Sequence, residues 1–130
     1  MATFTRQLGD HPDLTVITVV GAPTLDELTE FSLEYNRSQP TRLTLWDWRE
    51  GRLPEMSSQV ASERVEVVAE QFDDLPDRRT ASVVGSERDF GLARILGAWV
   101  QSQAAERGWN AIGETFRDYQ DALRWLTANG

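Results

Sequence analysis

The run of residues 14–20, LTVITVV, constrains the fold of this chain more than any other feature. It is β-branched and nearly apolar throughout, and it contains no charged side chain. A strand exposed on one face alternates polar and apolar residues, whereas a strand covered on both faces is continuously apolar. We therefore expect residues 14–20 to lie inside a sheet that carries helices on both faces.

Turn-forming residues and helix caps divide the rest of the chain into elements. The turn at 9–13 joins 14–20 to a strand at 3–8, so these two strands form a hairpin. Thr24 and Glu27 have the spacing of a capping box, in which each side chain bonds the other residue's free backbone N–H. The other expected elements are strands at 42–48, 80–84 and 111–116 and helices that begin near 56–58, at Ser86 and at Asp118.

These elements follow the order ββαβαβαβα, in which strands alternate with helices after the hairpin. Such an order is typical of a mainly parallel sheet joined by right-handed crossovers. The sequence predicts a single α/β domain over residues 1–130, with a sheet of four or five strands, an N-terminal antiparallel hairpin and about four helices. In the second helix, the apolar spacing runs from Ala61 to Phe72.

The composition excludes several classes of function. The chain has 13 basic and 21 acidic residues, a net charge of −8, no cysteine and one histidine. Disulfides and thiolate chemistry are impossible, and a single histidine cannot build a Cys/His zinc site. A polyanion would be repelled, so we expect no nucleic-acid partner. No run approaches the roughly 18 apolar residues of a membrane span and no secretory signal is present, so we expect a cytoplasmic protein without stable membrane insertion.

The end of the third strand holds a candidate carboxylate. Ligands of open α/β sheets bind at the carboxyl ends of strands, and Asp47, Trp48 and Arg49 stand there. Arg49 would keep Asp47 ionised, as in a ligand-orienting or regulatory site. The alternative is a strand-end ion pair or a helix-capping contact that serves only the structure, since ion pairs also perturb carboxylates.

The end of the fourth strand offers a candidate anion site. Gly85 and Ser86 stand at a helix start, where free N–H groups attract anions. The alternative is a turn glycine followed by an N-cap serine. Two serines at the start of the second helix and Trp99 of the third helix are added to these strand-end residues. The candidate ligand or partner residues are then Asp47, Trp48, Arg49, Ser57, Ser58, Gly85, Ser86, Arg88, Phe90 and Trp99.

No part of the sequence pairs a nucleophile with a base. His11 stands in a turn between Asp10 and Asp13, and a triad would need a nucleophile brought to it from elsewhere. We therefore expect no enzyme, no catalytic residue, no metal and no cofactor.

Three segments together resemble a known family. They are LWDWR at 45–49, RTASVV at 79–84 and ETFRDYQDALRWL at 114–126, and with the hairpin they are similar to the SpoIIAA-like family. That family resembles the STAS domains of anti-sigma-factor antagonists and the CRAL-TRIO lipid-carrier domain. The resemblance implies a STAS-like α/β domain in a small bacterial cytoplasmic protein.

The resemblance also bears on the start of the second helix. The antagonists carry Asp-Ser-Ser or a similar sequence there, and a partner kinase phosphorylates one serine. This chain has Ser57 and Ser58 in that region, but Met56 precedes them instead of an aspartate. The phosphorylation switch therefore carries over poorly.

Two functions of different classes follow. The first is a non-enzymatic regulatory domain that docks a protein partner, or a second copy of itself, through the second and third helices. The wide apolar face of the third helix and Trp99 favour it. The alternative, which the lipid-carrier resemblance implies, is a carrier of a small apolar ligand. Its pocket would lie near Trp48, Phe90, Leu92 and Trp99.

Overall fold

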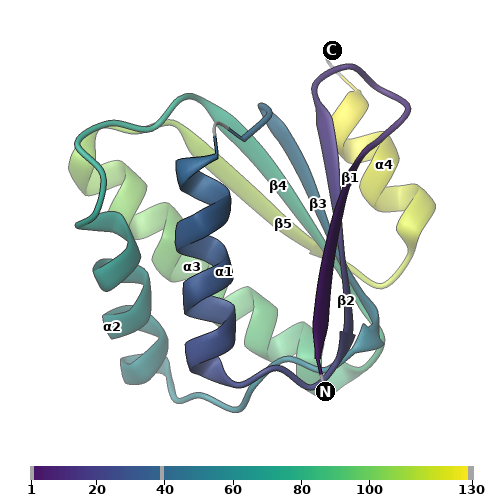
Figure 1. Ribbon diagram of the computed structural model, residues 1–130, viewed down its shortest axis with the longest axis horizontal. Coiled ribbons are helices and arrows are strands. Elements are labelled where there is room, and N and C mark those ends of the chain that lie inside the picture. The colour runs from purple at the N-terminus through teal and green to yellow at the C-terminus, as the bar shows by residue number, and fades with distance from the viewer. Residues whose placement is uncertain (1, 39, 129–130) are drawn as a thin grey trace.

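A five-stranded sheet with the strand order β1-β2-β3-β4-β5 forms the centre of the molecule (Figure 1). The structure, a computed structural model, describes residues 2–38 and 40–128. The element order agrees with the prediction from the sequence. The strands are β1 (Thr3–Leu8), β2 (Leu14–Gly21), β3 (Leu43–Gly51), β4 (Arg78–Val84) and β5 (Ala111–Phe116), and the helices are α1 (Leu25–Arg37), α2 (Ser58–Ala69), α3 (Glu87–Arg107) and α4 (Tyr119–Thr127).

The pairing of the strands decides which face each helix covers. β1 is antiparallel to β2, and β3, β4 and β5 are then added in parallel, always on the same side. Right-handed crossovers that all advance in one direction place their helices on one face of the sheet. Accordingly α1, α2 and α3 cover one face, which we call the inner face, and α4 covers the other (Figure 1).

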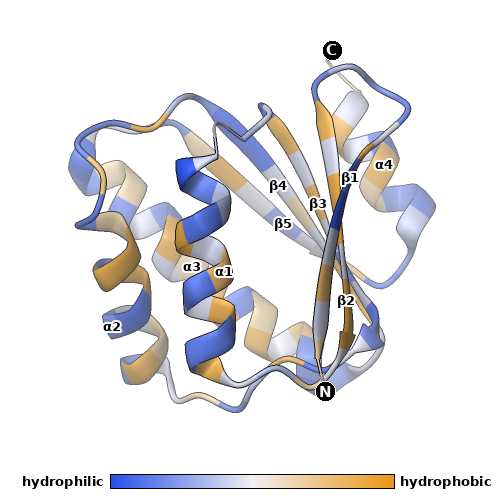
Figure 2. Ribbon diagram, in the orientation of Figure 1, coloured by the Kyte–Doolittle hydropathy of each residue, from blue (hydrophilic) through white to orange (hydrophobic). Residues whose placement is uncertain are grey.

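Each face of the sheet has its own apolar core. The β2 side chains are buried on both faces, with Val16 toward α4 and Ile17 toward the inner face, which confirms the sequence interpretation. Figure 2 shows the apolar residues of β2 and β3 and others on α2. The core under α4 contains Leu14, Val16, Leu43, Leu45, Ala81, Val83, Ala122 and Leu126. The inner core contains Ile17, Val19, Leu28, Tyr35, Trp48, Leu53, Val84 and Ala93.

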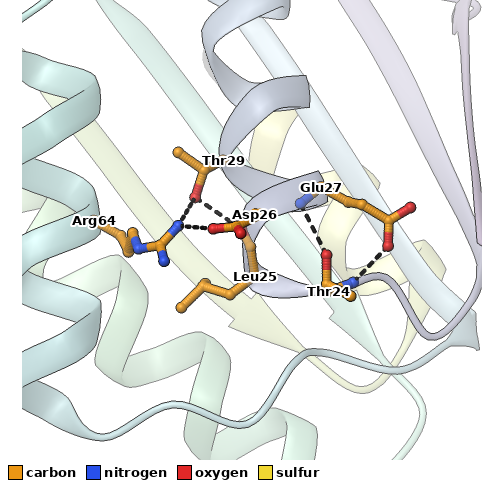
Figure 3. Close-up of polar contacts among 6 residues, drawn as sticks. All are labelled: Thr24, Leu25, Asp26, Glu27, Thr29 and Arg64. Carbon is orange, nitrogen blue, oxygen red and sulfur yellow. Dashed lines mark hydrogen bonds and ion pairs between the residues drawn. The ribbon is translucent and has the colours of Figure 1, made fainter.

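The predicted helix caps are present. Thr24 and Glu27 form the capping box at the start of α1 (Figure 3). Ser86 Oγ accepts a hydrogen bond from the backbone N–H of α3, and Asp118 caps α4 in the same way. α3 ends at Gly108, whose φ of 74° is left-handed and favours glycine. No helix within the described ranges is long and apolar enough to cross a membrane.

The boundaries of β3, β4 and α2 differ from the sequence prediction. β3 continues to Gly51 and does not end at residue 48, because Glu50 and Gly51 still pair with Val20 and Gly21 of β2. β4 begins at Arg78 and not at Thr80, because the backbone N–H groups of Arg78 and Arg79 bond carbonyls of the chain on either side. α2 ends at Ala69 and does not reach Phe72, whose N–H bonds the Ala69 carbonyl in a turn. The earlier start of β4 matters most, because it adds Arg78 to the inner face of the sheet.

Candidate functional site

The ten candidate residues lie at separate places in the fold. Asp47 and Trp48 are consecutive in β3, so their side chains point to opposite faces of the sheet. Asp47 and Arg49 lie at the α4 side, whereas Trp48 belongs to the inner core. Ser58 and Trp99 meet between α2 and α3. The structure therefore does not bring the ten residues together in one site.

Asp47 and Arg49 form a self-contained ion pair. Arg49 Nε and Nη2 donate to the two carboxylate oxygens at 2.9 and 2.8 Å, and the Arg49 backbone N–H donates at 3.1 Å. Burial raises the pKa of Asp47, but these bonds and the arginine charge outweigh it and hold the pKa below 3.8. The guanidinium also lies 4.5 Å from the ring centre of Tyr119. The pair thus joins β3 to the start of α4.

Residues 85–90 are engaged in contacts with neighbouring elements of the fold. A side chain at Gly85 would lie 3.3 Å from the Arg49 carbonyl oxygen, and Ser86 Oγ is occupied as the cap of α3. Arg88 donates to the Leu53 carbonyl and to Asp89, which is only 3% exposed. Asp89 also accepts from the Leu53 N–H at 3.3 Å. These bonds fasten the segment between β3 and α2 to the start of α3.

A shallow groove runs between the first turns of α2 and α3. Ser57 caps α2, and Ser58 Oγ accepts a hydrogen bond of 3.0 Å from Trp99 Nε1, which joins the two helices. The apolar side chains of the groove come from both helices and the segment before α2. The groove is lined by Glu55, Met56, Ser57, Val60, Glu87, Arg88, Gly91, Leu92 and Ile95.

A cavity of about 640 Å³ lies between the inner face of the sheet and helices α1, α2 and α3, and its lining continues to the β5 edge. Small residues on facing surfaces create it. A side chain built at Gly97 of α3 would meet no described residue within 4 Å, and β4 lines the cavity with Arg78, Thr80 and Ser82. The apolar walls are formed by Leu28, Trp46, Trp48, Val65 and Leu96, among others.

One end of the cavity is polar. Tyr35 Oη and Thr44 Oγ1 share a buried hydrogen bond of 2.7 Å. Arg78 Nη1 donates to Asn36 Oδ1 at 2.5 Å, while Arg78 Nη2 is buried and has no hydrogen-bond partner among the described residues. Burial lowers the pKa of Arg78, and the nearby Tyr35 opposes this. Sequence reasoning missed these residues.

A signal for them exists in the sequence. Every second position of β4 is polar, at Arg78, Thr80 and Ser82. A strand that should be covered on both faces therefore has one polar face. The opposite face of the same strand carries Ala81 and Val83, which are buried under α4. A polar stripe facing helices indicates that something other than an apolar core lies between the layers.

The outer boundary of the cavity is a polar tie between α1 and α2. Arg64 Nη1 donates to Asp26 Oδ1 at 2.5 Å and to Thr29 Oγ1 at 3.4 Å (Figure 3). Leu25, Thr29 and Arg64 also line the cavity. The Asp26 side chain is 82% exposed, so the tie lies at the surface of the protein.

The cavity differs from the pocket expected near Trp48, Phe90, Leu92 and Trp99. Trp48 lines the cavity and Leu92 lines the groove, but Phe90 and Trp99 line neither. Within residues 2–38 and 40–128, no cluster of three His, Cys, Asp or Glu side chains could hold a metal ion. The arrangement is suited to binding, through an outer groove and an inner cavity.

Comparison with known proteins identifies the fold. No protein-family model and no curated protein matches the chain. An uncharacterised DUF3478 protein with a SpoIIAA-like fold from Shewanella loihica has a TM-score of 0.55 at 15% identity, over 96% of this chain and 93% of that one. An anti-sigma factor antagonist from Mycobacterium paratuberculosis has a TM-score of 0.50 at 13% identity, over 95% and 94%. The chain therefore has the SpoIIAA-like fold.

Proposed function

We propose that this chain is a non-enzymatic regulatory domain that docks a protein partner through the groove between α2 and α3. The observation that carries the proposal is the apolar floor of the groove, made by Met56, Val60, Leu92 and Ile95. Ile95 is 36% exposed, although large apolar side chains usually lie inside. The same fold occurs in an anti-sigma factor antagonist, a protein named for its action on another protein.

The charges at the rim indicate what kind of partner fits. Glu55 and Glu87 line the groove, whereas the guanidinium of Arg88 is turned to Asp89 and the Leu53 carbonyl. The chain as a whole has a net charge of −8. Complementary charges favour encounter and fix the orientation of a complex. We therefore infer a partner that places apolar side chains in the groove and basic ones around it.

Site-specific cross-linking tests this docking. A photo-reactive residue at Ile95 is expected to cross-link one protein in the native cells, and the same residue at the exposed position Glu106 of α3 is expected not to. Ile95→Asp should abolish the complex, whereas Ser102→Asp, the same charge change on the same helix outside the groove, should not. Equal cross-linking at both positions would contradict the proposal. Light scattering on the eluting complex separates a second copy of this chain from a different partner.

A specific observation favours the second candidate, a carrier of a small apolar ligand. The cavity of about 640 Å³ lies within the range of roughly 300–1,000 Å³ that is typical of small-molecule sites. Trp46 and Trp48 give it a rigid aromatic wall, with ring centres 6.1 Å apart. Native mass spectrometry of protein purified from its own cells is expected to show a bound small molecule. Gly97→Leu should remove that mass by filling the cavity, and an unliganded wild-type protein would contradict this function.

A further inference from the structure

We propose that the cavity between the sheet and helices α1, α2 and α3 binds an amphipathic monocarboxylate and that Arg78 holds its carboxylate. The proposal rests on the second candidate function, the ligand carrier, and names the chemical class of the ligand. It is independent of the docking groove, which lies between α2 and α3 and shares no lining residue with the cavity.

Arg78 is the first part of the argument. An arginine side chain remains charged at any physiological pH, and a buried charge is costly unless it is paired. The ion pairs among the described residues join Asp47 to Arg49, Asp26 to Arg64, Asp89 to Arg88 and Asp121 to Arg124, so none includes Arg78. Its one bonded nitrogen, Nη1, is held by a neutral amide oxygen of Asn36. Arg78 lines the cavity, and among the described residues its buried Nη2 has no hydrogen-bond partner.

The surroundings of Arg78 indicate a single negative charge on the ligand. Two further arginines line the cavity: Arg64 is paired with Asp26, and the exposed Arg94 lies 5.9 Å from the ring centre of Phe90. Tyr35 and Thr44 share one hydrogen bond, so whichever hydroxyl donates, the other keeps a proton that it can donate. Thr44 pairs in register with Thr80, two residues along the inner face from Arg78. Arg78 beside these neutral donors matches a carboxylate better than a dianionic phosphate.

The rest of the cavity fits an apolar body attached to that carboxylate. Beyond the polar end, the walls are Leu28, Trp46, Trp48, Val65 and Leu96. The space beneath Gly97 remains open because no side chain fills it. An apolar chain placed there gains burial and dispersion contacts, while its charged end neutralises the arginine. The ligand therefore satisfies both features that the protein alone leaves open.

Arg79 provides a matched control for this inference. It is the next residue of β4, and its Nε is likewise buried without a hydrogen-bond partner. However, its guanidinium lies 4.2 Å from the ring centre of Trp125, which packs against the α4 core, and Arg79 itself does not line the cavity. Arg78→Gln and Arg79→Gln each remove one positive charge from the same strand, but only the first removes it from the cavity wall.

The test measures binding of dodecanoate and of its uncharged methyl ester by the change in tryptophan fluorescence. The wild-type protein is expected to bind dodecanoate about 10-fold or more tightly than the ester, as a charge-assisted hydrogen bond provides. Arg78→Gln should remove this preference, and Arg79→Gln should keep it. Gly97→Leu should weaken both ligands. Circular dichroism of each variant checks that it is folded.

Each other outcome overturns a defined part of the proposal. Equal wild-type affinity for dodecanoate and the ester, or equal loss in Arg78→Gln and Arg79→Gln, would refute the role of Arg78 and leave the carrier function standing. Tighter binding of dodecyl phosphate than of dodecanoate would refute the monocarboxylate class. Failure of the wild-type protein to bind either probe, or binding that Gly97→Leu does not change, would refute the cavity as a ligand site altogether.

Discussion

At the scale of the single residue, two arginines differ in how the fold partners their positive charge. Arg49 donates three hydrogen bonds to the carboxylate of Asp47, two residues away. Arg78 is half-buried beside a neutral amide, and its buried Nη2 has no hydrogen-bond partner among the described residues. The first arrangement stabilises the folded protein directly, whereas the second imposes a cost on the ligand-free state.

This cost leads to a prediction about stability. Arg78→Met replaces the charged side chain with an apolar one that follows a similar path, and we expect the free energy of unfolding without ligand to rise by about 1 kcal/mol. Arg79→Met should lower it, because the contact with the Trp125 ring is lost. Urea unfolding of the two purified variants measures both values. A less stable Arg78→Met protein would show that the arginine stabilises the empty fold.

The Asp47–Arg49 pair predicts a pH dependence. The pKa of Asp47 lies below 3.8 in the folded protein, so the pair stabilises the fold above about pH 4 and the contribution disappears as the pH falls through the lowered pKa. The Arg49 side chain is 50% exposed, so the effect is expected to stay below about 1 kcal/mol. Urea unfolding of wild type and Asp47→Asn should differ at pH 6 and converge toward pH 2. A difference that does not change with pH would exclude this origin.

At the scale of the element, local signals predicted most of the fold. Each of these signals lies within a few residues of sequence. They are the capping box of α1, the N-caps Ser86 and Asp118, and the apolar run of β2. The start of β4 is different, because it depends on carbonyls of Arg42 and Asn110, which are far away in the chain. Such pairing cannot be read from a local pattern.

The candidate site was less predictable than the fold for a related reason. Reasoning from strand ends grouped Asp47 with Trp48, although consecutive residues of a strand face opposite layers. The cavity is lined both by Gly97 of α3 and by Thr80 and Ser82 of β4, a combination of a helix and a strand that no spacing in the sequence reports. Only the polar residues at alternate positions of β4 indicated the cavity in the sequence.

Two glycines give a prediction for individual elements. Gly91 lies within α3 and a side chain there would meet nothing, so Gly91→Ala should raise the free energy of unfolding by about 0.5–1 kcal/mol through better helix propensity. Gly51→Ala in β3 should lower it, since the new carbon would lie 2.7 Å from the Val19 carbonyl oxygen. Thermal unfolding of both variants checks the opposite signs. A neutral Gly51→Ala would mean that β2 and β3 separate easily there.

At the scale of the whole molecule, the excess of acidic residues affects association. With a net charge of −8 and two glutamates at the rim of the groove, binding of a basic partner should weaken as salt rises. The yield of the cross-link at Ile95 is therefore expected to fall between about 0.05 and about 0.5 M salt. Cross-linking that salt leaves unchanged or strengthens would indicate a purely apolar contact.

The strand order has a consequence for how the protein is made. Because β1 to β5 follow one another in space as they do in the chain, each strand finds its neighbour already in place as the ribosome delivers it. The helices of the inner face arrive during this process, but α4 comes after all the strands. The surface that includes Leu43, Leu45 and Val83 thus stays uncovered until residues 119–127 emerge. During synthesis this face is the one most exposed to aggregation and to chaperones.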